Sequence, residues 1–260
     1  MLPASEGTLV YFASYLARTV RHSTIKLYLA AVRNLHITAG FNDPLKGKLL
    51  LRKVVRGILR FQGAKKIRRQ PVTPRMLSSI RPVLQAWLSP RDFSMVWAAF
   101  TLAFFAFLRC SEFTYLGVRK FRPHFDLSTD CITFQPNLAC PQYMTVKLKS
   151  SKTDVFRHGQ SLTIAHSSSK ICAVMAMRDY FLLARPQTGP LFYFQSGRYL
   201  TRGVVSHLLQ DSARFAGLPY QCLKGHSFRI GVASVAAAAG LQDWLKIGRA
   251  SCRERVYVLV

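Results

Sequence analysis

The sequence predicts a mainly α-helical protein with a small antiparallel sheet, an α+β fold. Apolar residues recur at three- and four-residue steps towards both ends of the chain, which is the period of amphipathic helices. Between residues 131 and 164 the pattern changes to short β-type runs separated by polar turns. Half of the 260 residues are hydrophobic, so the chain can bury a core and form one large or two small domains.

The first 64 residues predict a small helical domain. Residues 8–17 are apolar with helical periodicity. Ser23 is the expected N-cap of a second helix, which ends at Gly40. A third helix is expected over residues 49–61. The apolar positions of the second helix predict its buried face: Ile25, Tyr28, Leu29, Val32 and Leu35.

Basic residues follow one side of these helices. Arg52, Arg56 and Arg60 recur at four-residue steps without an acid to balance them. Such a ridge is either a solvated face or a phosphate-binding surface, and the mutual repulsion of the arginines favours phosphate. Lys26 and Arg33 lie on the polar side of the second helix and are assigned to the same surface.

Residues 65–71 predict a basic interdomain linker. The segment contains Lys65, Lys66, Arg68 and Arg69 and ends in Pro71. Its charge would let it follow a DNA backbone, and a nuclear localisation patch explains the same composition equally well.

The second domain is expected from residue 72 to residue 246. Thr73 and Pro74 form a helix start, and Ser89-Pro90 opens a buried helix that is expected to end near Leu108. Three short strands are expected over residues 131–134, 143–149 and 161–164. Helices then follow over residues 171–184, 201–215 and 227–239.

The charge balance points to a polyanionic partner. The chain has 37 Lys and Arg against 11 Asp and Glu, a formal net charge of +26, and such self-repulsion favours nucleic acid as the partner. The six cysteines form no metal-binding spacing. They are typical of a reduced cytosolic or nuclear protein. We expect no metal, no cofactor, no signal peptide and no membrane segment.

Four residues are candidates for chemistry. Arg109 leaves a long apolar run and requires an anionic partner, which is either Glu112 alone or a phosphate with Glu112 as support. Lys152 lies in a polar turn, where most lysines are simply solvated. His226 and Arg229 are three residues apart at a helix start and would face a phosphate together, although this spacing also occurs by chance.

In combination these motifs resemble the tyrosine recombinase (phage-integrase-like) family. The sequences of residues 106–113, 148–154 and 225–231 are most similar to those of recombinases from eukaryotic mobile elements such as DIRS-type retrotransposons. Residues 24–32 resemble the helical core-binding domain that precedes the catalytic domain in that family.

The resemblance implies cleavage of duplex DNA by a tyrosine hydroxyl, through a 3′-phosphotyrosyl intermediate and without metal. Arg109 and Arg229 would stabilise the phosphorane, and His226 would act as general acid/base. Lys152 would protonate the leaving 5′-oxygen, with Lys149 as the fallback. Active relatives work as tetramers on DNA, and a nuclear location would follow from DNA as the partner.

The C-terminus departs from the family pattern. Ala250 follows Gly248-Arg249, where the family has Trp or His. Counted from His226, the family tyrosine would fall at or just beyond Val260, so Tyr257 is the candidate nucleophile at an unexpected position. Residues 247–256 also resemble a translated adapter oligonucleotide, and we expect residues 247–260 to be an atypical, chimeric tail.

Two other functions fit parts of the pattern. A DNA-binding module with a vestigial active site needs no nucleophile. A type IB topoisomerase uses a related constellation but relaxes supercoils without strand exchange. A generic RNA-binding protein gives no reason for the four candidate residues to occur together.

Overall fold

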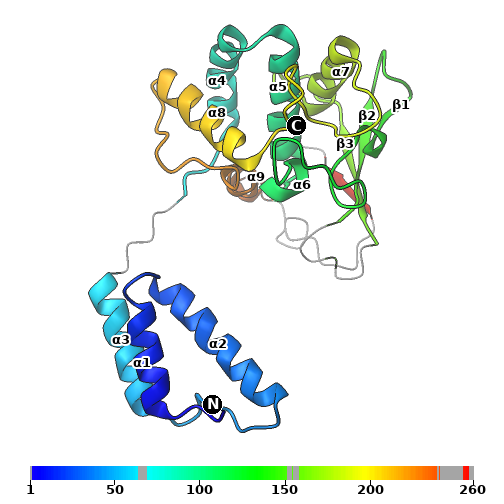
Figure 1. The fold of residues 1–260 in the computed structure, drawn as a ribbon. Helices are drawn as coiled ribbons and strands as arrows, with labels where there is room; N and C mark the ends of the chain where they lie inside the picture. The colour runs from blue at the N-terminus through cyan, green and yellow to red at the C-terminus, as the bar shows by residue number, and fades with distance from the viewer. Residues whose placement is uncertain are drawn as a thin grey trace. The chain divides into compact units, whose positions relative to one another are not determined.

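The computed structural model describes residues 2–63, 69–150, 154, 158–238 and 240, together with the backbone of residues 254–257. The chain divides into two compact units, Met1–Ile67 and Arg68–Val260 (Figure 1). The predicted fold class is confirmed, because helices predominate and a small sheet lies in the second unit.

The first unit is built from α1 (Glu6–Leu16), α2 (His22–Thr38) and α3 (Leu49–Gln62). Ser5 caps α1, since its hydroxyl accepts the Thr8 N–H at 3.2 Å. The helices enclose a small core of Leu9, Ala13, Ile25, Leu29 and Leu51.

The predicted N-cap of the second helix is wrong. Helix α2 begins at His22, before Ser23, and its N-cap residue Arg21 makes no side-chain cap bond. Gln62 Oε1 accepts the His22 N–H at 2.7 Å, so a side chain from the end of α3 satisfies this early donor. The Gln62 amide also donates to the carbonyls of Ala17 and Val20, which fastens the α1–α2 turn to α3.

Part of the predicted buried face of α2 is exposed. Ile25 and Leu29 are buried, whereas Tyr28 and Leu35 remain 47% and 57% exposed. The reason is geometric: α1 and α3 together cover only a narrow stripe of α2, and residues one position away from that stripe face solvent.

The second unit contains a helical layer around one central helix. Its helices are α4 (Pro74–Trp87), α5 (Pro90–Phe105), α6 (Cys110–Phe113), α7 (Ala173–Ala184), α8 (Arg202–Phe215) and α9 (Ser227–Ala238), with a 3-10 turn at Thr129–Cys131. Thr73, Ser89 and Thr201 cap α4, α5 and α8 with their hydroxyls. Every residue from Ser94 to Phe105 is buried, because α5 packs against α7 on one side and α9 on another.

The sheet lies beside α7 (Figure 1). Strands β1 (Ile132–Gln135), β2 (Tyr143–Leu148) and β3 (Gln160–Ala165) pair antiparallel in sequence order, as the sequence predicts. Alternate residues of β2, namely Met144, Val146 and Leu148, are buried in the core. A further strand that was not predicted, β4 (Glu254–Tyr257), runs parallel to β3 at the edge of the sheet.

Within the ranges described above, no helix is both long enough and apolar enough to cross a membrane.

Candidate active site

Arg109 lies at the start of α6 rather than at the end of the long helix. Helix α5 ends at Phe105, and Phe107 turns the chain with a φ of 53°, in the left-handed region. Glu112 accepts the backbone N–H of Arg109 at 2.7 Å and its Nη1 at 2.8 Å. The Glu112 side chain is only 6% exposed, while that of Arg109 is 28% exposed. The buried carboxylate of Glu112 therefore orients the guanidinium of Arg109, and part of the Arg109 side chain remains accessible to solvent.

Arg229 reaches the same turn from the other end of the unit. It lies in the first turn of α9, which begins at Ser227 immediately after His226. Its Nη1 donates to the carbonyl of Phe107 at 3.3 Å, across 122 positions of sequence. The two arginines predicted to act together are thus brought to one turn of the chain.

Glycine allows this close approach. A Cβ built on Gly225 would lie 2.3 Å from Cys110 Sγ, so the segment before His226 packs directly against the residue that follows Arg109. A side chain at Gly225 would separate the two halves of the site.

The pKa of His226 reflects the arginines that surround it. Burial lowers the pKa of His226 below its ordinary value, and the positive charges of Arg69, Arg229, Arg109 and Arg202 lower it further, in that order. A lowered pKa keeps the imidazole neutral at neutral pH. It can then accept a proton from a hydroxyl nucleophile.

Arg202 was not predicted as a site residue. It is the first residue of α8, and the preceding Thr201 pairs with Tyr115, just after α6, in a parallel bridge. The Tyr115 N–H also donates to the Leu200 carbonyl at 3.0 Å, which holds the start of α8 beside α6. The available signal was weak: a basic residue directly after a threonine N-cap in a strongly basic chain.

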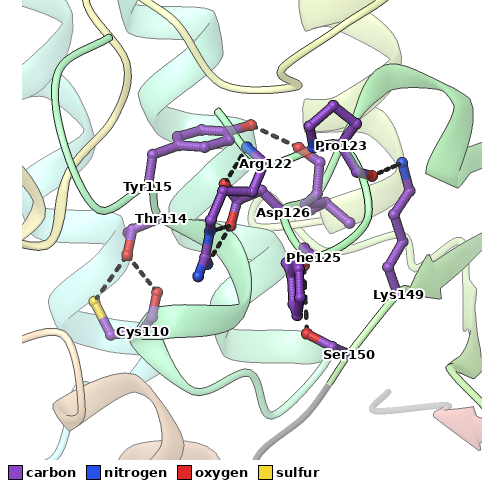
Figure 2. Close-up of polar contacts among 10 residues, drawn as sticks. Cys110, Thr114, Tyr115, Arg122, Pro123, Phe125, Asp126, Lys149 and Ser150 are labelled. Carbon is purple, nitrogen blue, oxygen red and sulfur yellow. Dashed lines mark hydrogen bonds and ion pairs between the residues drawn. The ribbon is translucent and has the colours of Figure 1, made fainter. Parts of the chain in front are cut away.

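Lys149 is engaged by the segment that follows α6 (Figure 2). Its Nζ donates to the Pro123 carbonyl at 2.9 Å and to Ser128 Oγ, and lies 3.5 Å from Asp130 Oδ2. The three ammonium hydrogens are therefore directed to three acceptors. In this arrangement Lys149 holds the end of β2, and its fallback role as general acid stays a prediction.

Residues next to Lys149 and Pro123 also form hydrogen bonds that hold this region together. Ser150 Oγ donates to the Phe125 carbonyl at 3.5 Å (Figure 2). Arg122 Nη2 donates to Oδ1 of the buried Asp126 carboxylate at 2.6 Å. The segment from residue 122 to 128 thus supports the end of β2.

Some predicted site residues lie outside the described residues: Lys65, Lys66, Arg68 and Lys152. For Tyr257 the description extends to the backbone, which is aligned with Ile164 of β3. The roles predicted for these residues stay predictions.

The basic residues of the first unit that we predict to contact phosphates differ in whether a carboxylate pairs with them. Lys26, Arg52, Arg56 and Arg60 are exposed. Arg33 is also exposed, but its Nε donates to Asp43 Oδ2 at 2.7 Å, an ion pair that partly neutralises it.

No group of three or more His, Cys, Asp or Glu side chains suited to a metal ion occurs in the part of the chain that the structure describes.

Comparison with known proteins finds a recombinase relative in sequence and recombinase structures with a similar fold. No protein-family model matches the sequence. The chain is 27% identical over 248 residues to an integrase/recombinase xerD homolog of Selenomonas ruminantium, which covers 91% of this chain and 67% of that protein.

Solved structures of recombinases share the fold. A structure of the XerH site-specific recombinase bound to palindromic difH substrate matches with a TM-score of 0.56 and 13% identity, over 96% of this chain and 67% of that one. The Tn1549 transposon integrase in complex with circular intermediate DNA matches with a TM-score of 0.55 and 13% identity, over 96% and 78%. In another XerH complex the match covers 65% of that protein's chain, so this chain spans about two thirds of the length of several relatives.

The chain is thus similar in sequence to an integrase/recombinase and shares the fold of solved recombinase and integrase structures. The closer similarity to DIRS-type recombinases stays a prediction.

Proposed function

We propose that this chain is a site-specific DNA recombinase or integrase that binds duplex DNA and holds one backbone phosphate for cleavage. The observation that carries the proposal is the meeting of Arg109 with the His226–Arg229 pair at the Phe107 turn. Two guanidinium groups beside a neutral imidazole are suited to a phosphate that becomes five-coordinate, since forked donors stabilise the charge of its equatorial oxygens.

The chemistry is a balanced transesterification. A tyrosine oxygen forms a bond to phosphorus as the bond to the 5′-oxygen breaks, which leaves a 3′-phosphotyrosyl link and a 5′-hydroxyl. His226 accepts the tyrosine proton. Lys152, which follows β2 in the sequence, gives a proton to the 5′-oxygen. Tyr257 is the candidate nucleophile.

The first unit serves as the core-binding domain in this proposal. Its exposed cations, Lys26, Arg52, Arg56 and Arg60, would bind backbone phosphates, with the linker residues Lys65, Lys66, Arg68 and Arg69 following the same duplex. A homo-oligomer on DNA and a nuclear location complete the proposal.

The test uses a covalent trap. Duplexes bound by the chain would be enriched from a random-sequence pool and rebuilt with a nick near each possible cleavage position, so that the released end diffuses away. We expect a covalent protein–DNA band that is lost in Arg109→Gln and Arg229→Gln. A chain in which residues 247–260 are replaced by the C-terminal segment of a xerD-type relative separates an unsuitable nucleophile from an inactive site.

The outcomes are distinct. A band from the chimera alone would show a working phosphate site without a working Tyr257. Tight duplex binding without a band from either protein would leave a DNA-binding module with a vestigial site. Relaxation of supercoiled DNA without strand exchange would indicate topoisomerase activity instead.

A further inference from the structure

The basic linker meets the second unit beside the candidate active site. Two backbone hydrogen bonds join them: Gln70 N–H donates to the Cys222 carbonyl at 3.4 Å, and Val72 N–H donates to the Ser227 carbonyl at 3.0 Å. His226 lies between these two acceptors along the chain. Arg69, the described residue just before Gln70, is therefore carried to the edge of the His226 segment.

Helix α9 is shaped to accept the linker at this place. A Cβ built on Gly231 would lie 1.7 Å from the Val72 carbonyl oxygen, so the residue directly after the linker rests on the backbone of α9. Val72 itself is fully buried. The position of the linker end is thus set by packing and hydrogen bonds within the second unit, independently of where the first unit lies.

Arg69 is an exposed cation at the edge of the candidate site. Among the residues that the structure describes, no ion pair or hydrogen bond occupies its guanidinium. The neighbouring charges are also positive: Arg229 on α9, Arg109 at the N-cap of α6 and Arg202 on α8 all act on His226 together with Arg69. Glu112 pairs with Arg109, and the remaining positive charge around His226 favours an anion at this place.

We propose that Arg69 is a further phosphate-binding arginine of the active site, supplied by the linker, and that it contacts the DNA strand that His226 and Arg229 hold. This inference rests on the proposed function. It gives the linker a role beyond connection: the segment that follows the DNA backbone also completes the anion pocket. DNA captured by the linker is then already in contact with the catalytic groups.

The effect on His226 supports this placement. The charge of Arg69 is the largest single contribution to the lowered pKa of His226 after burial itself, ahead of those of Arg229 and Arg109. A bound phosphate would offset these positive charges and raise the pKa of His226. The imidazole of His226 is therefore a direct reporter of anion binding in this pocket.

The experiment uses the full chain with isotope-labelled histidine and follows the His226 imidazole by NMR, its signal being assigned with His226→Gln. Inorganic phosphate is the probe, titrated against chloride at matched ionic strength so that general screening is subtracted. Arg69→Gln is compared with Arg75→Gln, a matched control, because Arg75 is an exposed arginine on α4 of the same unit.

We expect phosphate to shift the His226 signal, and Arg69→Gln to weaken phosphate binding about tenfold, since a hydrogen-bonded charged donor typically contributes that much or more. Arg75→Gln should change it less than about twofold, as is usual for an exposed charge. Arg69→Lys should keep the lowered pKa of His226 but restore phosphate affinity only in part, because an ammonium cannot form the forked contact.

The failures can be told apart. Equal phosphate affinity in Arg69→Gln and Arg75→Gln would overturn the role of Arg69 and leave the proposed function standing. An unsubstituted chain whose His226 signal ignores phosphate would overturn both. Arg69→Lys with full phosphate affinity would show that Arg69 acts only as a distant charge, which also contradicts a direct contact.

Discussion

Glu112 accepts hydrogen bonds from both the backbone N–H and the guanidinium of Arg109, at 2.7 and 2.8 Å. One carboxylate therefore fixes both the start of α6 and the direction of the arginine. Because Glu112 is nearly buried, this support is insulated from solvent, unlike most surface ion pairs.

Glu112→Gln should lower both stability and phosphate binding. The amide can accept only one of the two hydrogen bonds well, and the loss of a buried charged acceptor should cost about 1.5–3 kcal/mol in the free energy of unfolding. Asp179→Asn is the control, because Asp179 is 61% exposed and lies 3.8 Å from Arg178. Urea denaturation of both variants measures the difference, and equal costs would contradict the structural role of Glu112.

Gly231→Ala should be severely destabilising. The added Cβ would lie 1.7 Å from the Val72 carbonyl oxygen, a backbone atom that cannot move aside alone, so we expect a loss of about 3 kcal/mol, the upper end of the usual cost of overpacking. Gly203→Ala, in α8 of the same unit, meets only Thr201 Oγ1 at 3.9 Å. It should stabilise the chain by up to about 1 kcal/mol through helix propensity. Thermal unfolding compares the two, and a neutral Gly231→Ala would refute the close packing of linker and α9.

The titration of His226 predicts a loss of stability on acidification. Its folded-state pKa lies below the ordinary value of 6.5. As the pH falls through 6.5, the unfolded chain therefore binds the proton first, and this favours unfolding. The stability present above that pH is lost progressively down to the folded-state pKa.

His226→Gln should remove this part of the pH dependence. Unfolding free energies at pH 7.5 and 5.5, compared between the two proteins, isolate it, since the contributions of other groups cancel. A difference between the two proteins that does not vary with pH would contradict the lowered pKa.

The arginine ridge of α3 should control the salt dependence of DNA binding more than Arg33 does. Arg52 is exposed and available to a phosphate, so Arg52→Gln should reduce the slope of log K against log salt by about 0.9. Arg33→Gln should reduce it less, because the Asp43 carboxylate already offsets the charge of Arg33 at 2.7 Å. Fluorescence anisotropy with one duplex over a salt series measures both slopes. A larger effect from Arg33 would place the DNA on the other side of α2.

The sequence predicted the helices well where apolar periodicity and capping agree, as at Thr73 and Ser89, which cap α4 and α5. It failed where a distant side chain decides the outcome. Gln62 satisfies the first donor of α2 and so replaces the expected cap at Ser23. Strand β4 was missed because its pairing with β3 depends on a contact remote in sequence.

The candidate site was predictable to the extent that its motifs are local. Arg109, Glu112, His226 and Arg229 could be named from short sequence patterns, and the structure brings them to one turn. The positions of Arg69 and Arg202 beside His226 depend on backbone contacts between segments far apart in sequence. No local pattern encodes such contacts.

The left-handed turn at Phe107 has a further consequence. A non-glycine residue in this conformation costs about 1–2 kcal/mol locally, yet Phe107 is buried and its carbonyl receives Arg229. The geometry that presents Arg109 is thus maintained by burial of an aromatic ring rather than by the preference of the turn itself. A substitution that loosens the packing around Phe107 would therefore displace Arg109 before it unfolds the chain.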